Sequence, residues 1–146
     1  MVFSKACEYG IRATIYISQQ SLKGIRVNQK DISKEIDSPE AFTGKILQQL
    51  VKGGIIISIK GSMGGFEMES KKINSIRLTD IVKAIDGESI DKLCVMGLKK
   101  CSEINPCPLH HKYKNIKKEF LAMLKNTKLI DMSDSINNGL SCLKIN

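Results

Sequence analysis

The chain has 146 residues and a formal charge of +8 at neutral pH, with 42% hydrophobic and 26% charged residues. This composition excludes a wholly disordered protein, and the length fits one domain with an appendage. The cationic surplus favours a polyanionic partner, of which nucleic acid is the usual one.

The five cysteines and the first residues bear on the cellular compartment. An odd cysteine count does not indicate a disulfide framework. The opening residues, MVFSKACEYG, hold no long apolar stretch, and no apolar run reaches the roughly 20 residues of a membrane span. We therefore expect a cytoplasmic protein with reduced thiols, no signal peptide and no membrane partner.

Apolar spacing predicts three helices in the first part of the chain, over residues 4–20, 29–35 and 38–52. Ser38 followed by Pro39 is typical of a helix start, and a Gly-Gly pair ends the third helix. The order helix, short helix, turn, helix is typical of a helix-turn-helix unit.

The period then changes to that of strands. β-Branched residues predict a strand over 55–59, and a second strand over 66–68 follows the glycine-rich turn KGSMGG. The sequence therefore predicts a hairpin, or wing, directly after the helix-turn-helix unit.

The second half is again helical. A helix over 80–85, capped by Thr79, precedes a long loop over 86–108 and a long helix over 109–126. Loops of this length are usually functional or disordered. The polar residues from 133 onward are expected to fray.

These elements predict a mainly α fold with a small β-wing. We expect a winged helix-turn-helix DNA-binding region over residues 1–76. A helix, a cysteine-rich sensor loop and a long C-terminal dimerisation helix occupy 77–131, and a flexible tail occupies 132–146.

A recognition helix needs an apolar face for the core and a face of short polar side chains for bases and phosphates. Lys45 and Gln48 are candidates for base contacts, and Gly44, costly in a helix interior, suggests close approach to another backbone. The candidate DNA-binding residues of this helix and of the wing are Ser38, Thr43, Gly44, Lys45, Gln48, Lys60, Ser62, Gly64 and Gly65. The alternative is an amphipathic surface helix followed by an ordinary hairpin.

Three cysteines lie within the loop. Cys94, Cys101 and Cys107 have the spacing Cys-x6-Cys-x5-Cys, and His110 follows as part of Cys-Pro-Leu-His. Three thiolates suit a soft metal centre such as an iron–sulfur cluster, whereas Cys3His is also a structural zinc set. Metal-free thiol redox chemistry is a further alternative. No oxyanion-hole motif or orienting acid accompanies Cys107 and His110, so we expect no enzyme.

The segments SKACEYGIRA, SPEAFTGKILQQLVKGGII, KGSMGGFEM and LTDIVKAIDG resemble the Rrf-type (Rrf-two) family of bacterial winged-helix repressors. That family includes the IscR and NsrR regulators of iron–sulfur assembly and nitric-oxide response. The resemblance covers about residues 1–131. It implies a homodimer paired through the long helix, a pseudo-palindromic operator in double-stranded DNA, and a cluster of the 2Fe–2S or 4Fe–4S type.

The resemblance also implies a fourth cluster ligand. It is either His110 or an acidic residue of the first helix, here Glu8, donated by the partner subunit. One residue more than in the commonest family spacing separates Cys94 from Cys101. The sequence thus predicts a redox- or nitric-oxide-responsive transcriptional repressor. The alternative is a regulator of the same fold that acts through thiol redox, zinc or a protein partner.

Overall fold

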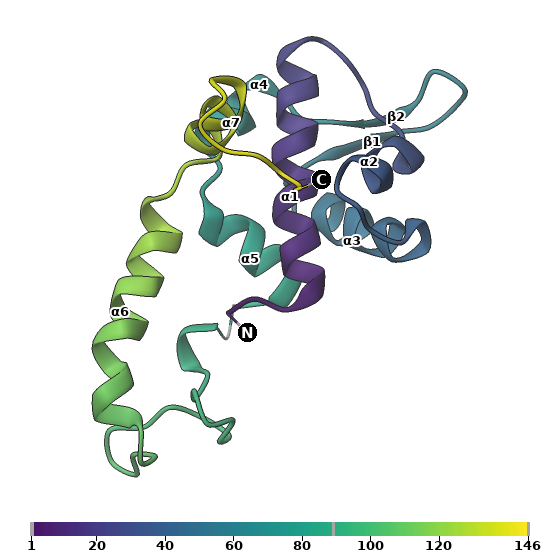
Figure 1. The fold of residues 1–146 in the computed structure, drawn as a ribbon. Helices are drawn as coiled ribbons and strands as arrows, with labels where there is room; N and C mark the ends of the chain where they lie inside the picture. The colour runs from purple at the N-terminus through teal and green to yellow at the C-terminus, as the bar shows by residue number, and fades with distance from the viewer. Residues whose placement is uncertain (1, 89, 146) are drawn as a thin grey trace.

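The computed structural model describes residues 2–88 and 90–145 and is mainly helical, with one two-stranded antiparallel sheet (Figure 1). The elements, in chain order, are α1 (Lys5–Leu22), α2 (Gln29–Glu35), α3 (Glu40–Lys52), β1 (Ile57–Ile59), β2 (Gly65–Glu67), α4 (Ser70–Ser75), α5 (Leu78–Asp86), a short 3-10 helix (Ile90–Lys92), α6 (His110–Asn126) and α7 (Leu129–Asn137). This composition of elements confirms the predicted mainly α class with a small β-hairpin.

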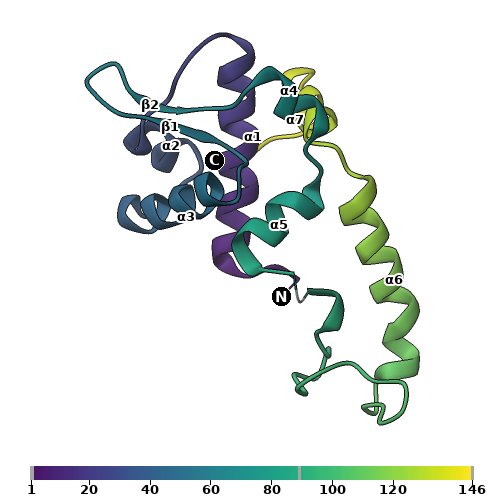
Figure 2. The same cartoon turned by 180° about the vertical axis from the view of Figure 1, so that it is seen from behind.

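Helix α1 runs through the middle of the molecule, with α2 and α3 on one side and α5 and α7 on the other (Figures 1 and 2). The helix begins at Lys5 because the Ser4 side chain accepts a hydrogen bond from the Cys7 backbone N–H. A Cβ at Gly10 would lie 3.0 Å from the Ile85 side chain. The absence of a side chain at Gly10 therefore lets α5 cross α1 closely.

The hairpin is tied to the helix-turn-helix unit. Strands β1 and β2 pair with Ser58 opposite Phe66. The Phe66 N–H donates to the Val27 carbonyl at 2.7 Å, and the Val27 N–H donates back at 3.1 Å. Strand β1 is shorter than predicted, because Ile55 and Ile56 are buried in the bend that follows α3.

Helix α7 includes residues 132–137, the first part of the segment for which the sequence predicted a flexible tail. Its Ser133 side chain is fully buried and lies 2.6 Å from the Ser18 hydroxyl of α1. The Gln19 side-chain amide donates to Asn137 Oδ1 at 2.9 Å. Two polar residues of α7, Ser133 and Asn137, thus have hydrogen-bond partners on α1.

The entry into α5 also differs from the prediction. The predicted cap, Thr79, is wrong, because α5 begins at Leu78 and Arg77 is its N-cap. The Asp80 carboxylate accepts a hydrogen bond from the Arg77 backbone N–H at 2.8 Å. The short helix α4, which lies between the wing and α5, was not predicted.

Helix α6 lies apart from α1, with α5 between the two helices (Figures 1 and 2). Only His110 and Leu124 among its 17 residues are buried. An aromatic contact between Phe3 and Phe120, with ring centroids 5.6 Å apart, joins it to the N-terminal segment. Among the described residues, no helix combines the length and apolar character needed to cross a bilayer.

We predict that docking of the segment containing α7 contributes to global stability. Leu129 is fully buried, whereas Leu140 is 80% exposed. Leu129→Ala should lower the free energy of unfolding by about 2–5 kcal/mol, because it leaves a cavity in the core. Leu140→Ala should change that free energy by less than about 0.5 kcal/mol. Urea unfolding followed by circular dichroism measures both, and equal effects would contradict the docking.

Candidate functional site

Helix α3 separates its apolar and polar residues as a recognition helix requires. Ile46, Leu47 and Leu50 are buried against the core. Lys45 and Gln48 are exposed on the opposite face. These two side chains are therefore available to the edges of bases.

Two hydroxyl groups among the candidate DNA-binding residues lie at the start of α3. Thr43 is fully buried, and its Oγ1 donates to the Pro39 carbonyl at 2.8 Å. Ser38 is partly buried and its hydroxyl pairs with that of Thr43. The Thr43 hydroxyl is buried and bonded to the backbone at the start of α3. A contact between Thr43 and a DNA phosphate therefore does not fit this structure.

Gly44 makes room for a side chain of α2. A Cβ at Gly44 would lie 2.7 Å from Gln29 Nε2. That same nitrogen donates to the Glu40 carbonyl at 2.9 Å. The close neighbour is thus a side chain of α2, where the sequence suggested a backbone, and the contact fixes α2 against α3.

The wing exposes its tip and requires glycine at its base. Lys60 and Ser62 are exposed. A Cβ at Gly64 would lie 2.1 Å from the Ile59 carbonyl oxygen, and one at Gly65 would lie 2.6 Å from that of Val27. The roles of these two glycines in the structure are therefore steric, and Lys60 and Ser62 are the predicted wing residues free to meet DNA.

Arg26 holds the wing through two hydrogen bonds, and the sequence did not predict this role. Its Nε donates to Glu67 Oε2 at 3.0 Å, and its Nη1 donates to the Met63 carbonyl at 3.0 Å. Arg26 precedes Val27, the residue that pairs with Phe66. No local sequence pattern predicts the contacts of Arg26 with the wing, because the partners are about 40 positions apart in sequence.

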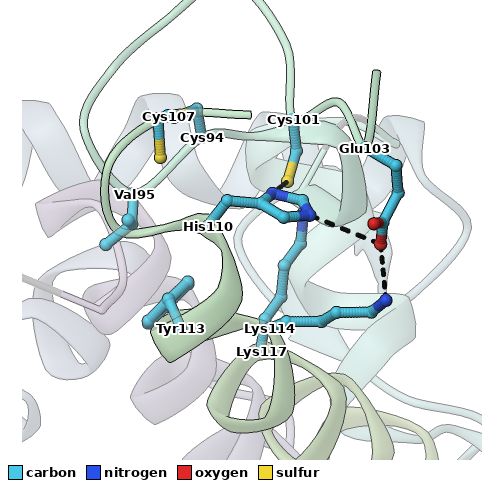
Figure 3. A pocket seen from close by; sticks show the side chains of 9 residues that line it. All are labelled: Cys94, Val95, Cys101, Glu103, Cys107, His110, Tyr113, Lys114 and Lys117. Atoms are coloured by element: carbon cyan, nitrogen blue, oxygen red, sulfur yellow. Dashed lines mark hydrogen bonds and ion pairs between the residues drawn. The ribbon is translucent and has the colours of Figure 1, made fainter. Parts of the chain in front are cut away.

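The predicted metal ligands of the loop lie together at the start of α6. Cys94, Cys101, Cys107 and His110 line one pocket, which we call the cysteine pocket (Figure 3). Cys94, Cys107 and His110 are buried. The remaining residues of its wall are Val95, Glu103, Tyr113, Lys114 and Lys117.

His110 faces two different neighbours with its two ring nitrogens (Figure 3). Nδ1 lies 3.3 Å from Cys101 Sγ. Nε2 lies 3.3 Å from a Glu103 carboxylate oxygen but makes no hydrogen bond among the described residues. The Lys114 ammonium pairs with the same carboxylate, and this pairing, followed by the contact with His110, lowers the pKa of Glu103.

The loop backbone favours a thiolate at Cys94. Backbone N–H groups of Leu98 and then Met96 point at its sulfur and lower the pKa of Cys94, with a smaller contribution from the Cys107 thiol. The turn is held by a hydrogen bond from the Gly97 N–H to the Cys94 carbonyl at 2.9 Å. A thiolate is the form in which cysteine binds metal.

Glu8 does not belong to the cysteine pocket within one chain. It lies in the first turn of α1, where its carboxylate pairs with Lys5 at 3.2 Å. Its side chain is one-third exposed. Glu8 could therefore serve as a ligand only to a pocket of another subunit.

The chain is similar to known transcriptional regulators. The sequence profile of the Rrf2 family, described as iron-dependent transcriptional regulator, matches residues 3–135. A protein of Aquifex aeolicus, provisionally named an HTH-type transcriptional regulator, is 30% identical over 134 residues, which cover 90% of this chain and 91% of that protein.

Two solved structures have a similar fold. CymR, the global cysteine regulator of B. subtilis, matches with a TM-score of 0.72 at 20% identity, over 90% of this chain and 95% of CymR. IscR of T. potens matches with a TM-score of 0.71 at 19% identity, over 95% of this chain and 90% of IscR. These likenesses confirm the winged-helix architecture.

We predict that Cys7 is chemically inert in the folded protein. Burial, and secondarily Asp86, raises the pKa of Cys7 to about 12, so at pH 8 it is a protonated thiol inside the core. Cys142 is exposed. Iodoacetamide followed by peptide mass spectrometry should label Cys142 in the native state and Cys7 only after unfolding. Equal labelling of the two cysteines in the native state would contradict this placement.

Proposed function

The chain belongs to the Rrf2 family of transcriptional regulators, and from this premise we propose that it is a repressor whose DNA affinity depends on an iron–sulfur cluster held in the cysteine pocket. It is a regulator and not an enzyme. The observation that carries the proposal is that three thiols and one imidazole line a single pocket at the start of α6.

The donor set of the cysteine pocket fits such a cluster. Iron–sulfur clusters are bound by cysteine thiolates, and histidine replaces cysteine in some of them. Cys94, Cys101 and Cys107 supply the thiolates, and His110 supplies the fourth ligand. A bound cluster supplies a redox-active group that is sensitive to oxidants and nitric oxide. Lys117 also lines the pocket and adds a positive charge to its wall.

The DNA-binding surface combines α3 and the wing. Winged-helix regulators place the recognition helix in the major groove. Lys45 and Gln48 reach base edges from α3, whereas Lys60 and Ser62 contact the flanking backbone from the wing tip. Arg26 keeps the wing in a fixed position relative to α2, so that both elements meet the duplex together.

We expect the functional unit to be a homodimer on a pseudo-palindromic operator. Large apolar side chains of α6 remain exposed in the single chain, among them Ile116 at 58% and Met123 at 45%. A stripe of this kind on a long helix is typical of an interface with another helix. Pairing through α6 sets the separation of the two α3 helices, which must match about 34 Å per DNA turn.

The cysteine pocket is directly connected to helix α6, through which we expect the dimer to pair. His110 is the first residue of α6, and the Lys117 ammonium donates to the Leu93 carbonyl at 3.2 Å, one residue before Cys94. Phe120 of α6 packs on Phe3 beside α1. Rearrangement of the loop would therefore shift α6 relative to α1 and change the spacing of the two α3 helices. If a cluster controlled that rearrangement, operator DNA would shift the affinity for the cluster by the same factor.

The same residues also suit a second candidate, a zinc-dependent or thiol-based regulator. Cys3His is a structural zinc set, and the lowered pKa of Cys94 favours metal binding and thiol oxidation alike. These candidates differ in the metal that the purified protein would contain, which is iron, zinc or none.

For the cluster, we predict that protein purified without oxygen contains iron and acid-labile sulfide and absorbs visible light. Cys101→Ser should lose both, because a thiolate ligand is removed. Cys142→Ser is the matched control and should retain the wild-type content, since Cys142 is exposed in the tail. Colourless, iron-free protein that still binds its operator normally would refute the cluster, and stoichiometric zinc would favour the second candidate.

For the DNA surface, we predict different effects of two substitutions on binding to an operator selected from random duplexes. Gln48→Ala should reduce discrimination against a mutated operator by about 1–3 kcal/mol. Lys60→Ala should weaken binding to all sequences and lower the salt dependence by about one released ion. Fluorescence anisotropy at several salt concentrations measures both. Lys144→Ala, in the C-terminal tail, is the control; an unchanged affinity for every variant would remove the assigned surface.

A further inference from the structure

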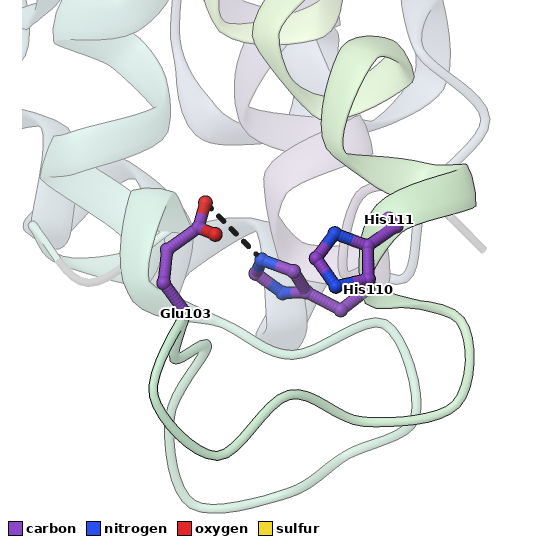
Figure 4. Close-up of side chains that lie close together, drawn as sticks. All are labelled: Glu103, His110 and His111. Carbon is purple, nitrogen blue, oxygen red and sulfur yellow. Dashed lines mark ion pairs between the residues drawn. The ribbon is translucent and has the colours of Figure 1, made fainter.

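The side of His110 that faces away from Cys101 forms a second cluster of potential ligands. Glu103, His110 and His111 each present one ligand atom, and these three atoms lie within 4.8 Å of one another (Figure 4). We propose that these three residues, which we call the outer site, bind a divalent transition ion of the Zn²⁺ type. The outer site uses His110 Nε2, whereas the cysteine pocket meets Nδ1.

The burial of His110 Nε2 without a hydrogen-bond partner among the described residues indicates a missing ligand. The His110 side chain is 5% exposed, and Nε2 makes no hydrogen bond among the residues that the structure describes. Buried polar atoms are almost always satisfied, so an unsatisfied one calls for an additional partner. Nε2 is directed toward the Glu103 carboxylate, an anionic oxygen ligand 3.3 Å away.

The donor set specifies the class of ion. Two imidazoles and one carboxylate, with a fourth position open to water, form a set that zinc occupies in many proteins. A histidine that binds metal through one nitrogen usually donates a hydrogen bond from the other. Here Nδ1 has such a partner, the Cys101 sulfur at 3.3 Å. The arrangement thus supplies both the ligands and the outer support of a metal site.

The two remaining ligands can adjust to the ion. Bonds of about 2.0–2.2 Å bring tetrahedral ligand atoms closer together than 4.8 Å. Glu103 and His111 are exposed, and the rings of His110 and His111 meet edge to face with centroids 5.1 Å apart. The exposed side chains rotate toward the ion, while buried His110 stays in place.

Lys114 already places a cation at this position. Its ammonium pairs with the Glu103 oxygen that faces His110 Nε2. Because the Lys114 side chain is 57% exposed, it can turn into solvent when a metal ion takes its place. Lys114 therefore competes with the ion, and its removal should strengthen binding.

Occupation of the outer site has a consequence that rests on the proposed function. A neutral imidazole has one nitrogen lone pair, so an ion on Nε2 leaves the proton on Nδ1. The Nδ1–H then donates to Cys101 and is not available as a ligand in the cysteine pocket. The divalent ion and the iron–sulfur cluster therefore compete for His110.

The test is a titration of reduced, cluster-free protein with Co²⁺ under anaerobic conditions, followed by absorption spectroscopy. We expect one ion per chain with d–d bands and without the intense sulfur-to-cobalt charge-transfer band of thiolate ligation. Glu103→Gln and His111→Ala should each weaken binding by at least about tenfold. Lys114→Met should tighten binding, and Glu119→Gln, an exposed carboxylate of the same helix, should leave it unchanged.

Two results would overturn the outer site. One is the absence of stoichiometric Co²⁺ binding by protein whose circular dichroism shows it to be folded. The other is an intense charge-transfer band together with unchanged affinity in His111→Ala, which would place the ion among the cysteines.

Reconstitution with iron and sulfide separates this proposal from the proposed function. His111 lies outside the cysteine pocket, so His111→Ala should take up the wild-type amount of cluster. Preloaded Zn²⁺ should reduce cluster uptake in the wild type and much less in His111→Ala; equal inhibition would overturn the competition. A wild-type protein that binds Co²⁺ at the outer site but never takes up a cluster would refute the proposed function alone.

Discussion

Packing around α1 is the constraint on which the rest of the molecule depends. Eight of its residues are buried, and they include polar as well as apolar side chains. The apolar ones hold α3 and α5, whereas Ser18 and Gln19 hold α7 through hydrogen bonds. The DNA-binding elements and α7 are thus all held by α1. Helix α6 is the exception, since only His110 and Leu124 of its residues are buried.

His110 is held by contacts on both sides of its ring. It is the first residue of α6, it is buried, and each ring nitrogen faces a different chemical group. Cys101 on one side is a soft sulfur ligand, and Glu103 on the other is a hard oxygen ligand. A change in what either side binds alters the proton distribution on the same ring. In the proposed mechanism, the position of α6 is therefore linked to what binds on either side of one imidazole.

The sequence predicted the DNA-binding half well, because its signals are local. Apolar spacing places α1 and α3, and the glycine-rich turn places the wing. The failures come from contacts between distant segments. Thr43 looked like a surface hydroxyl but is buried at the start of α3, and the buried hydrogen bond that joins Ser133 of α7 to Ser18 of α1 spans 115 positions of sequence. The cysteine spacing located the pocket, but the approach of Glu103 to the far side of His110 depends on the path of the loop, which no periodicity encodes.

The crowded backbone at the base of the wing limits how this protein can acquire new DNA preferences. Any side chain at Gly64 or Gly65 would collide with main-chain carbonyls, so neither position can be varied without rebuilding the hairpin. Ser62 and Met63, by contrast, are exposed at the tip, and Met63 is tied to Arg26 only through its carbonyl. A library that randomises these two positions together with Gln48 would thus sample altered operator recognition on an intact scaffold.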